Sequence, residues 1–332
     1  MNLLTGLFIV ALAGVLQGSF FLPMTYTKKW QWAHSWFAFS LLAMLLLNWG
    51  IAWLTIPGIG AIVAAVPVKL LLLVLFFGLL WGLGAILFGK AMDLLGMAIG
   101  YPVIMGINAI TGTLVPALVF SASVFLQLKG LLILFGAVIS VVGIIFCARA
   151  SAKKEEGTNL SKYTSAGLVL AIISGFTSCL PNLGAAFSQD ITRIAVEHGV
   201  GQAMAGNVIW SLFFTAGSLV NMGYCLFVLI KGKELKAFLN EHKTMNWGLI
   251  LGMSAMWIGS FYAYGYGAVV LGDLGLVVGW PLLVSLSIVI GNLWGIFRGE
   301  WTGAPQKARK TLNLGILVLI GAVLIIAASN HF

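Results

Sequence analysis

Charged side chains are scarce in this chain of 332 residues. Asp, Glu, Lys and Arg together make up 8% of it, whereas soluble proteins average about 25%. Hydrophobic residues make up 61%, and the mean hydropathy is +1.06. So few charges exclude a water-soluble globular domain. Because unpaired backbone groups are not tolerated in lipid, the long apolar runs are expected to be helices, and we predict an all-α membrane protein.

Residues that usually carry catalysis or hold metals are also few. The three cysteines, Cys147, Cys179 and Cys225, lie in apolar runs at spacings that suit no metal site. The apolar runs contain no paired carboxylates, no His-rich set and no Ser near a His, which argues against a membrane-embedded enzyme. We therefore predict no enzyme activity, no metal and no other cofactor.

The net charge of +9 comes from basic residues in short loops between apolar runs. This placement is typical of membrane orientation, so no nucleic-acid partner is predicted. A helix needs about 20 apolar residues to cross a bilayer core. Ten runs qualify: 3–23, 35–56, 68–92, 97–125, 130–148, 165–189, 203–230, 246–267, 273–297 and 312–329.

Ten crossings place the loops alternately on two sides of the membrane. One side then holds 15 of the 18 Lys and Arg. By the positive-inside rule this side is cytoplasmic, so both termini are predicted to be periplasmic or extracellular, in a multi-pass protein of the cell inner membrane.

Two matched motifs, which we call weak points because they weaken a helix, occur in the two halves of the chain. Gly-Tyr-Pro at 100–102 and Gly-Trp-Pro at 279–281 each lie in an apolar run, and a glycine follows each proline by ten residues. Proline removes a helix hydrogen bond, and glycine lowers the cost of bending there. Trp81 and Trp257 precede the two units at equivalent positions. A purely structural bundle would not require such aligned breaks.

These matches predict an internal duplication. Residues 1–150 would form a first five-helix repeat, 151–164 a cytoplasmic linker loop and 165–332 a second repeat. Because five is odd, the second repeat would enter the membrane from the opposite side. Inverted-topology repeats of this kind are typical of secondary transporters that open one site alternately to either face.

The runs 130–148 and 312–329 carry matched glycines amid Ala and Val, with almost no polar residues. Small residues at such spacing suit close helix contact. We expect these fifth and tenth helices at the periphery, and we predict a monomer or a weak homodimer formed through them.

Six stretches spread over nearly the whole chain are similar to one known family: 21–32 (FLPMTYTKKWQW), 80–84 (LWGLG), 95–100 (LGMAIG), 112–114 (GTL), 221–227 (NMGYCLF) and 300–301 (EW). They resemble the L-rhamnose–proton symporter family of the drug/metabolite transporter superfamily. The resemblance implies a ten-helix drug/metabolite transporter fold and uptake of L-rhamnose or a related deoxysugar with protons. An uncoupled facilitator, or a carrier of a glucose-like or ribose-like metabolite, is the alternative.

A sugar has apolar C–H faces and a rim of hydroxyls, so its site needs aromatic walls and neutral amides. Amides are costly in lipid unless they face the bundle interior. We predict that nine residues bind the substrate in one cavity: Gln17, Trp81, Tyr101, Asn108, Asn182, Trp257, Tyr264, Trp280 and Asn292. For any one of them, helix packing, interfacial anchoring or an interhelical hydrogen bond is the competing interpretation.

Proton coupling needs a titrating group that each side of the membrane can reach in turn. None of the nine acidic residues lies plainly in the middle of a run, which also argues against export of cationic drugs. The proton-coupling candidates are Asp93 and Asp190, although Asp93 lies one helical turn from Lys90 and could form a structural ion pair with it. The four histidines, His34 among them, are expected in solvated loops or at the terminus.

Overall fold

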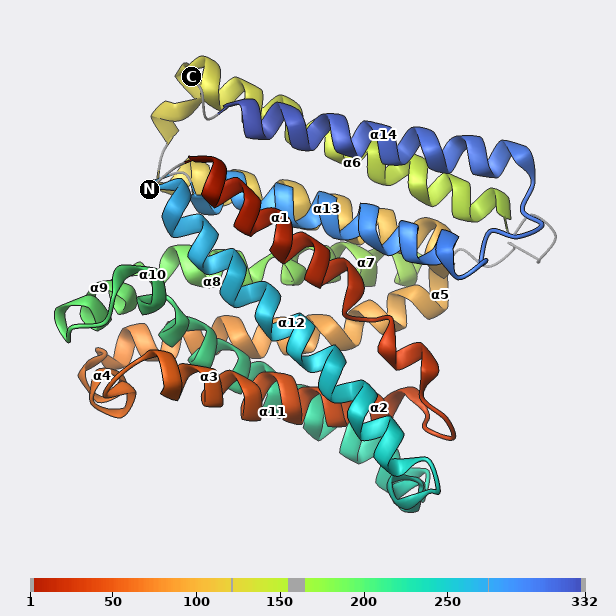
Figure 1. Ribbon diagram of the computed structural model, residues 1–332, viewed down its shortest axis with the longest axis horizontal. Coiled ribbons are helices and arrows are strands. Elements are labelled where there is room, and N and C mark those ends of the chain that lie inside the picture. Colours follow the sequence, from red (N-terminus) through yellow and green to blue (C-terminus); the bar gives the residue numbers. More distant parts are fainter. Residues whose placement is uncertain (1–2, 121, 155–164, 274, 330–332) are drawn as a thin grey trace.

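The computed structural model describes residues 3–120, 122–154, 165–273 and 275–329, without the side chains at 92, 93, 96–99, 101, 102 and 154. Within these ranges the regular structure is helical, with no strand. Long helices lie side by side along the longest axis of the molecule (Figure 1). The prediction of an all-α membrane protein is confirmed.

The α-helices are α1 Leu3–Ser19, α2 Trp32–Phe39, α3 Asn48–Thr55, α4 Ile59–Ala65, α5 Val68–Phe120, α6 Leu128–Lys154, α7 Ser165–Ser178, α8 Leu180–Phe187, α9 Gln189–Glu197, α10 Gln202–Ala205, α11 Asn207–Lys231, α12 Lys243–Leu271, α13 Gly275–Phe297 and α14 Gln306–Ala328. A π-helix, η2 Ser40–Leu47, joins α2 to α3. Short 3-10 helices are η1 Pro23–Tyr26, η3 Ala122–Leu126 and η4 Leu235–Leu239.

Nine segments of the described chain are long and apolar enough to cross a membrane, and they match nine of the ten predicted runs. The remaining run, 246–267, is α12, which has 29 residues and is therefore about 44 Å long. Its buried residues recur every three or four positions and include Trp257, Ser260 and Tyr264. These polar and aromatic groups lie on its buried face.

The 53-residue element α5 is not a straight rod. Ser174 of α7 donates to Gly84 O at 3.3 Å, and a Cβ added to the next residue, Gly175, would lie 2.6 Å from Ile107 Cβ. A straight helix would separate positions 84 and 107 by about 35 Å. The chain therefore reverses direction between the spans Val68–Ala91 and Val103–Phe120, as the separate runs 68–92 and 97–125 predict.

The second weak point does not interrupt its helix. Helix α13 is continuous through Pro281. The break in this half of the chain lies elsewhere, because the run predicted over 165–189 divides into α7, ending at Ser178, and α8, beginning at Leu180. Pro181 lies in the first turn of α8, where a missing N–H costs nothing. The side chains of Tyr101 and Pro102, in the first weak point, lie outside the description.

Helices from the two predicted repeats pack closely against one another. Helix α1 packs on α12 and α13, and α11 packs on α5. A Cβ added to Gly14 would lie 2.6 Å from Leu286 Cβ, and one added to Gly78 would lie 2.2 Å from Phe213 O. Glycine at these positions lets the helix backbones approach.

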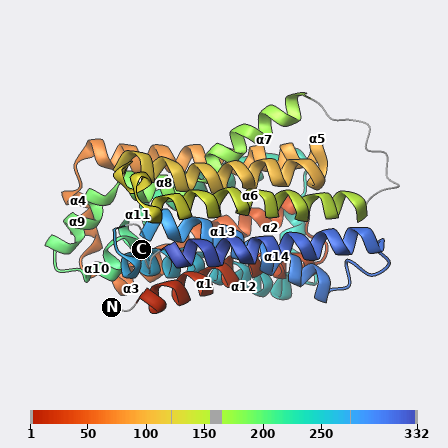
Figure 2. The same ribbon diagram turned by 90° about the horizontal axis from the view of Figure 1, so that it is seen from above.

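Helices α6 and α14 lie side by side at one edge of the bundle (Figures 1 and 2). A Cβ added to Gly136 would approach Ile326 Cγ1 to 2.4 Å, and one added to Gly315 would approach Cys147 Sγ to 2.7 Å. Two of the matched glycines therefore serve contact between the fifth and tenth predicted helices of the same chain.

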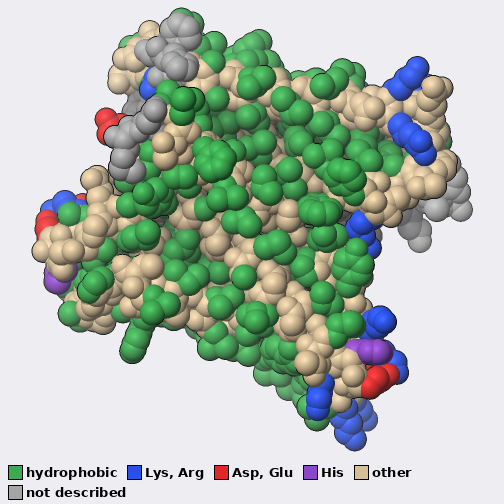
Figure 3. Space-filling model, in the orientation of Figure 1, with side chains coloured by type: hydrophobic (Ala, Val, Ile, Leu, Met, Phe, Trp, Pro, Cys, Tyr) green, Lys and Arg blue, Asp and Glu red, His purple; other side chains and the backbone are tan. Residues whose placement is uncertain are grey.

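The two ends of the bundle differ. The N- and C-terminal ends of the chain lie at one end, beside α9 and α10 (Figure 1). The opposite end carries the α13–α14 connection and the loops that precede α2 and α12. On the face that Figure 3 shows, most of the Lys and Arg side chains gather at this second end.

Candidate functional site

Aromatic rings from α5, α11, α12 and α13 meet inside the bundle and form what we call the ring cluster. The Trp81 and Trp257 rings stack, with centroids 5.9 Å apart and planes inclined by 28°. The fold thus brings the two equivalent tryptophans of the predicted repeats into direct contact. The members are Trp81, Trp210, Phe213, Phe214, Trp257, Phe261, Tyr264 and Trp280.

A hydrogen-bonded chain borders the ring cluster at Tyr264. The Tyr264 hydroxyl donates to Asn182 Oδ1, and Asn182 Nδ2 donates to Gly112 O at 2.7 Å. Both side chains are 0% exposed, so water cannot replace these partners. The break between α7 and α8 places Asn182 in the first turn of α8, facing α5 and α12.

Gly112 permits the close approach of Trp280. A Cβ on Gly112 would lie 2.2 Å from Trp280 Nε1, which is far inside van der Waals contact. The same indole nitrogen donates to Asn108 O at 3.4 Å. The equivalent glycine of the other half, Gly291, has only Gly18 O near an added Cβ, at 3.8 Å. The two matched glycines are therefore not used in the same way.

Asn108 has unused hydrogen-bonding capacity. Its Nδ2 is 3.8 Å from Met105 Sδ, and its Oδ1 is buried without a partner among the described residues. An unpaired buried acceptor costs about 1–3 kcal/mol. Asn108 Oδ1 is thus available to accept a hydrogen bond from a ligand beside Trp280.

Gln17 reaches the ring cluster through Ser260. The Ser260 hydroxyl lies 2.5 Å from Gln17 Oε1 and 2.7 Å from Trp257 O. Because a hydroxyl has a single hydrogen, it donates to one of these oxygens at a time. The arrangement leaves Gln17, which is half-buried, next to Trp257.

The other predicted residues are not seen in the ring cluster. Asn292 is half-buried and donates to Ile288 O of its own helix at 2.8 Å. Asp190 lies on α9 with a side chain 63% exposed, paired with Arg193 at 3.1 Å. The side chains of Tyr101 and Asp93 lie outside the description.

Choosing residues by repeat position missed the contribution of α11. Trp210, Phe213 and Phe214 supply three rings of the cluster. Trp210, Phe214, Gly217 and Asn221 recur every three or four residues and are all buried, the spacing of one helix face. This periodicity was present in the sequence and would have indicated that α11 faces the interior.

Several intramembrane amides join helices to one another. Tyr262 OH donates to Asn48 Oδ1 at 3.1 Å, and Asn48 Nδ2 donates to Trp210 O at 3.1 Å. Trp36 Nε1 donates to Asn221 Oδ1 at 2.9 Å. Asn48 and Asn221 therefore form hydrogen bonds between helices.

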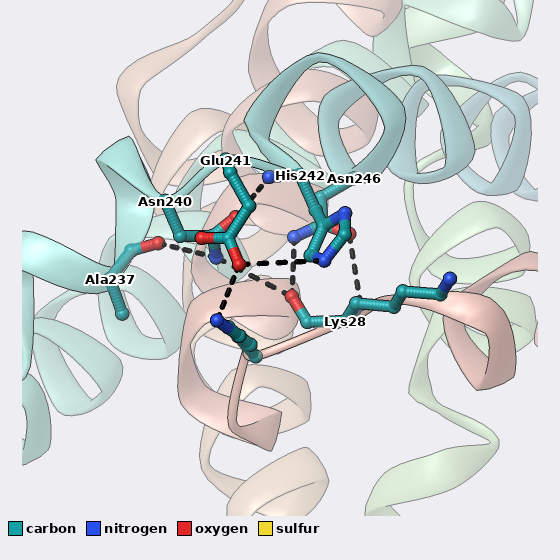
Figure 4. Close-up of polar contacts among 7 residues, drawn as sticks. Lys28, Ala237, Asn240, Glu241, His242 and Asn246 are labelled. Atoms are coloured by element: carbon teal, nitrogen blue, oxygen red, sulfur yellow. Dashed lines mark hydrogen bonds and ion pairs between the residues drawn. The ribbon is translucent and has the colours of Figure 1, made fainter.

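A set of polar contacts, which we call the end latch, ties the loop before α2 to the segment before and at the start of α12 (Figure 4). The backbone N–H of Lys28 donates to Asn246 Oδ1 at 3.0 Å, and Asn246 Nδ2 donates to Lys28 O at 2.8 Å. Lys29 Nζ pairs with Glu241, and this hydrogen bond holds the pKa of the Glu241 carboxyl below its usual value. The latch joins the two predicted repeats at the Lys-rich end.

The prediction that His34 is solvated was wrong, because the side chain is 0% exposed. Helix α2 begins at Trp32, before the predicted run, and so carries His34 inward. Its Nδ1 accepts from the Gln31 N–H at 3.1 Å, and Nε2 lies 2.9 Å from Glu234 O. Since Nδ1 is an acceptor, Nε2 carries the proton and donates to Glu234 O, which adds a further tie beside the end latch.

Most of the ring cluster is closed off in this structure, although Trp81 is half-buried. Trp257 is 4% exposed, Trp280 3% and Tyr264 0%. Two hollows formed by the described residues lie along the start of α14, and neither includes a ring of the cluster. A ligand could enter between the rings only after they separate.

The helices and the buried cluster of rings and amides define a multi-pass membrane protein with a polar, aromatic interior. The family model of the L-rhamnose-proton symport protein (RhaT) matches residues 2–330, and the chain belongs to this family. This confirms the resemblance drawn from the sequence. The family consists of transport proteins, which agrees with the prediction of a transporter rather than an enzyme.

Curated relatives align over almost their full length. The chain is 28% identical to the L-rhamnose-proton symporter of Escherichia coli O17:K52:H18 (strain UMN026 / ExPEC), over 97% of this chain and 96% of that protein. It is similarly 28% identical to the L-rhamnose-proton symporter of Shigella boydii serotype 18 (strain CDC 3083-94 / BS512), with the same two coverages. The symporter of Shigella dysenteriae serotype 1 (strain Sd197) is 27% identical, over 97% and 96%.

Proposed function

We propose that this protein is a secondary transporter that imports L-rhamnose, or a related deoxysugar, together with protons by alternating access. The observation that carries the proposal is the family match over residues 2–330. The curated relatives, which align over 97% of this chain, are themselves named L-rhamnose-proton symporters.

We place the sugar between the rings and the amides of the bundle interior. The apolar face and methyl group of a deoxysugar would stack on aromatic rings, and its hydroxyls would bond to neutral amides. The unpaired Oδ1 of Asn108 supports this position, because a sugar hydroxyl would satisfy it. The proposed binding residues remain Gln17, Trp81, Tyr101, Asn108, Asn182, Trp257, Tyr264, Trp280 and Asn292.

The closed ring cluster fits one stage of a transport cycle. Binding requires the stacked pair Trp81 and Trp257 to part, and these rings come from opposite predicted repeats. Rocking of one repeat against the other would separate them and expose the site to one face of the membrane. The end latch would hold the Lys-rich end shut in the present state.

We further propose the ten-helix, five-plus-five inverted repeat of the drug/metabolite transporter fold, with repeats 1–150 and 165–332 joined by the loop 151–164. Helix α12, the eighth run in chain order, would complete the ten crossings. The interrupted pairs α1–η1 and α7–α8 come at corresponding places in the two halves and support the duplication. The concentration of Lys and Arg at the end opposite the termini supports periplasmic termini in the inner membrane (Figures 1 and 3).

For proton coupling we propose Asp93 first and Asp190 second. Asp190 comes second because it is exposed and already forms an ion pair with Arg193. This pair explains its charge without a role in transport. A facilitator without coupling, or a carrier of a glucose-like or ribose-like sugar, is the second candidate function, since none of the Asp and Glu side chains that the structure describes is buried. The protein would act as a monomer or as a weak homodimer through α6 and α14.

Uptake of labelled L-rhamnose into proteoliposomes tests the proposal. Initial rates should rise with an inward proton gradient, and a protonophore should abolish the rise. Equal rates with and without the gradient would leave a facilitator, and no uptake under either condition would remove the assignment of rhamnose.

The proposed walls can be tested separately. Trp81→Ala and Trp257→Ala should each weaken rhamnose binding about two- to tenfold, as loss of a stacking ring does. Trp53→Ala is the matched control, because Trp53 is 73% exposed on the outside of α3. Normal binding by both wall variants would show that the sugar lies elsewhere.

A further inference from the structure

A hollow of about 370 Å³ lies where α6 ends and α14 begins. It is lined by Lys153, Gln306, Lys307, Lys310, Thr311 and Leu314. Three of these six side chains are lysines, and no Asp or Glu of the described residues lines the hollow. Helices α6 and α14 lie along one edge of the bundle (Figure 1), and none of the lining residues belongs to the ring cluster.

Among the residues that the structure describes, no acidic side chain forms an ion pair with the lysines of the hollow. Lys153 Nζ donates to Thr311 Oγ1 at 3.1 Å, and that hydroxyl donates in turn to Lys307 O at 2.8 Å. None of the ion pairs among the described residues includes Lys153, Lys307 or Lys310. Arg149, exposed one turn before Lys153 on α6, adds a further cation nearby. Like charges held this close favour an anion between them.

The hollow also marks the edge of an apolar surface. Exposed apolar side chains follow α6 and α14 away from it: Leu131, Phe135, Val138, Val142 and Ile145 on α6, and Leu314, Leu317, Ile320 and Leu324 on α14. These side chains face lipid in a membrane protein, so the lysines lie at the level of the phosphates. Figure 3 shows Lys or Arg side chains at this end of α14 beside the green apolar surface.

We propose that this hollow binds the headgroup phosphate of an anionic phospholipid. Lys307 and Lys310 would hold the phosphate oxygens. Lys153, positioned by its hydrogen bond to Thr311, would complete the donor set, and the acyl chains would lie along the apolar faces of α6 and α14. The continuous apolar surface favours a lipid over free phosphate, which would gain nothing from it. The inference needs only a membrane-spanning chain and is independent of the transported substrate.

Native mass spectrometry of the full-length protein in detergent, with phosphatidylglycerol or phosphatidylcholine added, tests the proposal. Wild type should retain phosphatidylglycerol in preference to phosphatidylcholine. The triple variant Lys153→Gln, Lys307→Gln, Lys310→Gln should bind phosphatidylglycerol at least about tenfold more weakly. The same three positions changed to Arg should restore binding, because Arg keeps the charge and the donors.

A matched control distinguishes specific lipid binding in the hollow from attraction to the general surface charge. Lys231, Lys236 and Lys243 are exposed at the same end of the bundle but outside the hollow, and changing all three to Gln should leave phosphatidylglycerol binding within about twofold of wild type. Equal loss in this control would overturn the proposal, as would displacement of the lipid by inorganic phosphate at matched concentration. Failure of the Arg variant to bind, with unchanged size-exclusion and circular-dichroism profiles, would also overturn it.

Discussion

At the scale of single residues, the Tyr264–Asn182 hydrogen bond joins two side chains that are both fully buried. We expect Tyr264→Phe to leave Asn182 Oδ1 buried without its donor, since both side chains are 0% exposed. The cost should be about 1–3 kcal/mol in the free energy of unfolding. Thermal unfolding in detergent, followed by circular dichroism, measures the loss. An unchanged midpoint would mean that the pair is not formed.

Gly112 offers a test of steric fit on the same element. Gly112→Ala places a Cβ 2.2 Å from Trp280 Nε1, so we expect a loss of about 1–3 kcal/mol from overpacking and slower uptake. Gly106→Ala is the control, because its Cβ would meet Val141 at an ordinary 3.5 Å. Equal behaviour of the two variants would argue that Trp280 moves aside freely.

The individual residues show how far sequence reasoning reaches. Repeat position pointed to Trp81 and Trp257, and the structure stacks these two rings on each other. Repeat position could not distinguish Asn108, which has a free oxygen, from Asn292, which bonds to its own helix, since an amide's partner depends on tertiary packing. His34 was misplaced because the helix start, at Trp32, lies outside the apolar run.

At the scale of elements, the end latch holds two loops together by one exposed ion pair and several hydrogen bonds. The Lys29 side chain hydrogen-bonds to Glu241 and lowers the pKa of that carboxyl from its usual 4.5. A lowered folded pKa means that the contribution is present at neutral pH and is lost as the pH falls through the folded value. We therefore expect the latch to loosen in acid below the usual pKa of Glu.

Hydrogen exchange at the Lys28 amide reports this change, because that N–H donates to Asn246 Oδ1 within the latch. After correction for intrinsic rates, protection at Lys28 should fall between about pH 5 and pH 3 in wild type. In Glu241→Gln the protection should be lower at neutral pH and should show no such step. A step that survives in the variant would assign the effect to another group.

The helices were easier to predict than their interruptions. Runs of apolar residues located nearly every crossing, because the bilayer imposes length and composition on each. The breaks at Cys179 and in the π-helix η2 Ser40–Leu47 left no such mark. Short helices outside the runs, such as α4 and α9, were also missed, because the prediction looked only for runs long enough to span a membrane.

At the scale of the whole molecule, the arrangement of the ends makes a prediction that does not depend on the substrate. The chain termini and the α9–α10 turn lie at one end of the bundle, and the α13–α14 connection lies at the other (Figure 1). Loop charge predicts that the second end is cytoplasmic. Because Cys147, Cys179 and Cys225 are buried, a cysteine introduced at either end can be labelled against little background.

We expect Thr302→Cys to react with a membrane-impermeant maleimide only from the cytoplasmic side, and His198→Cys only from the periplasmic side. Both positions are exposed, so a lack of reaction reports the membrane barrier rather than burial. Intact cells and inverted membrane vesicles supply the two sides. Labelling of both variants from one side would contradict the prediction that the two ends of the bundle lie on opposite sides of the membrane. Exchange of the two sides would instead reverse the orientation, and would place the end latch and the lysine-lined hollow at the outer face.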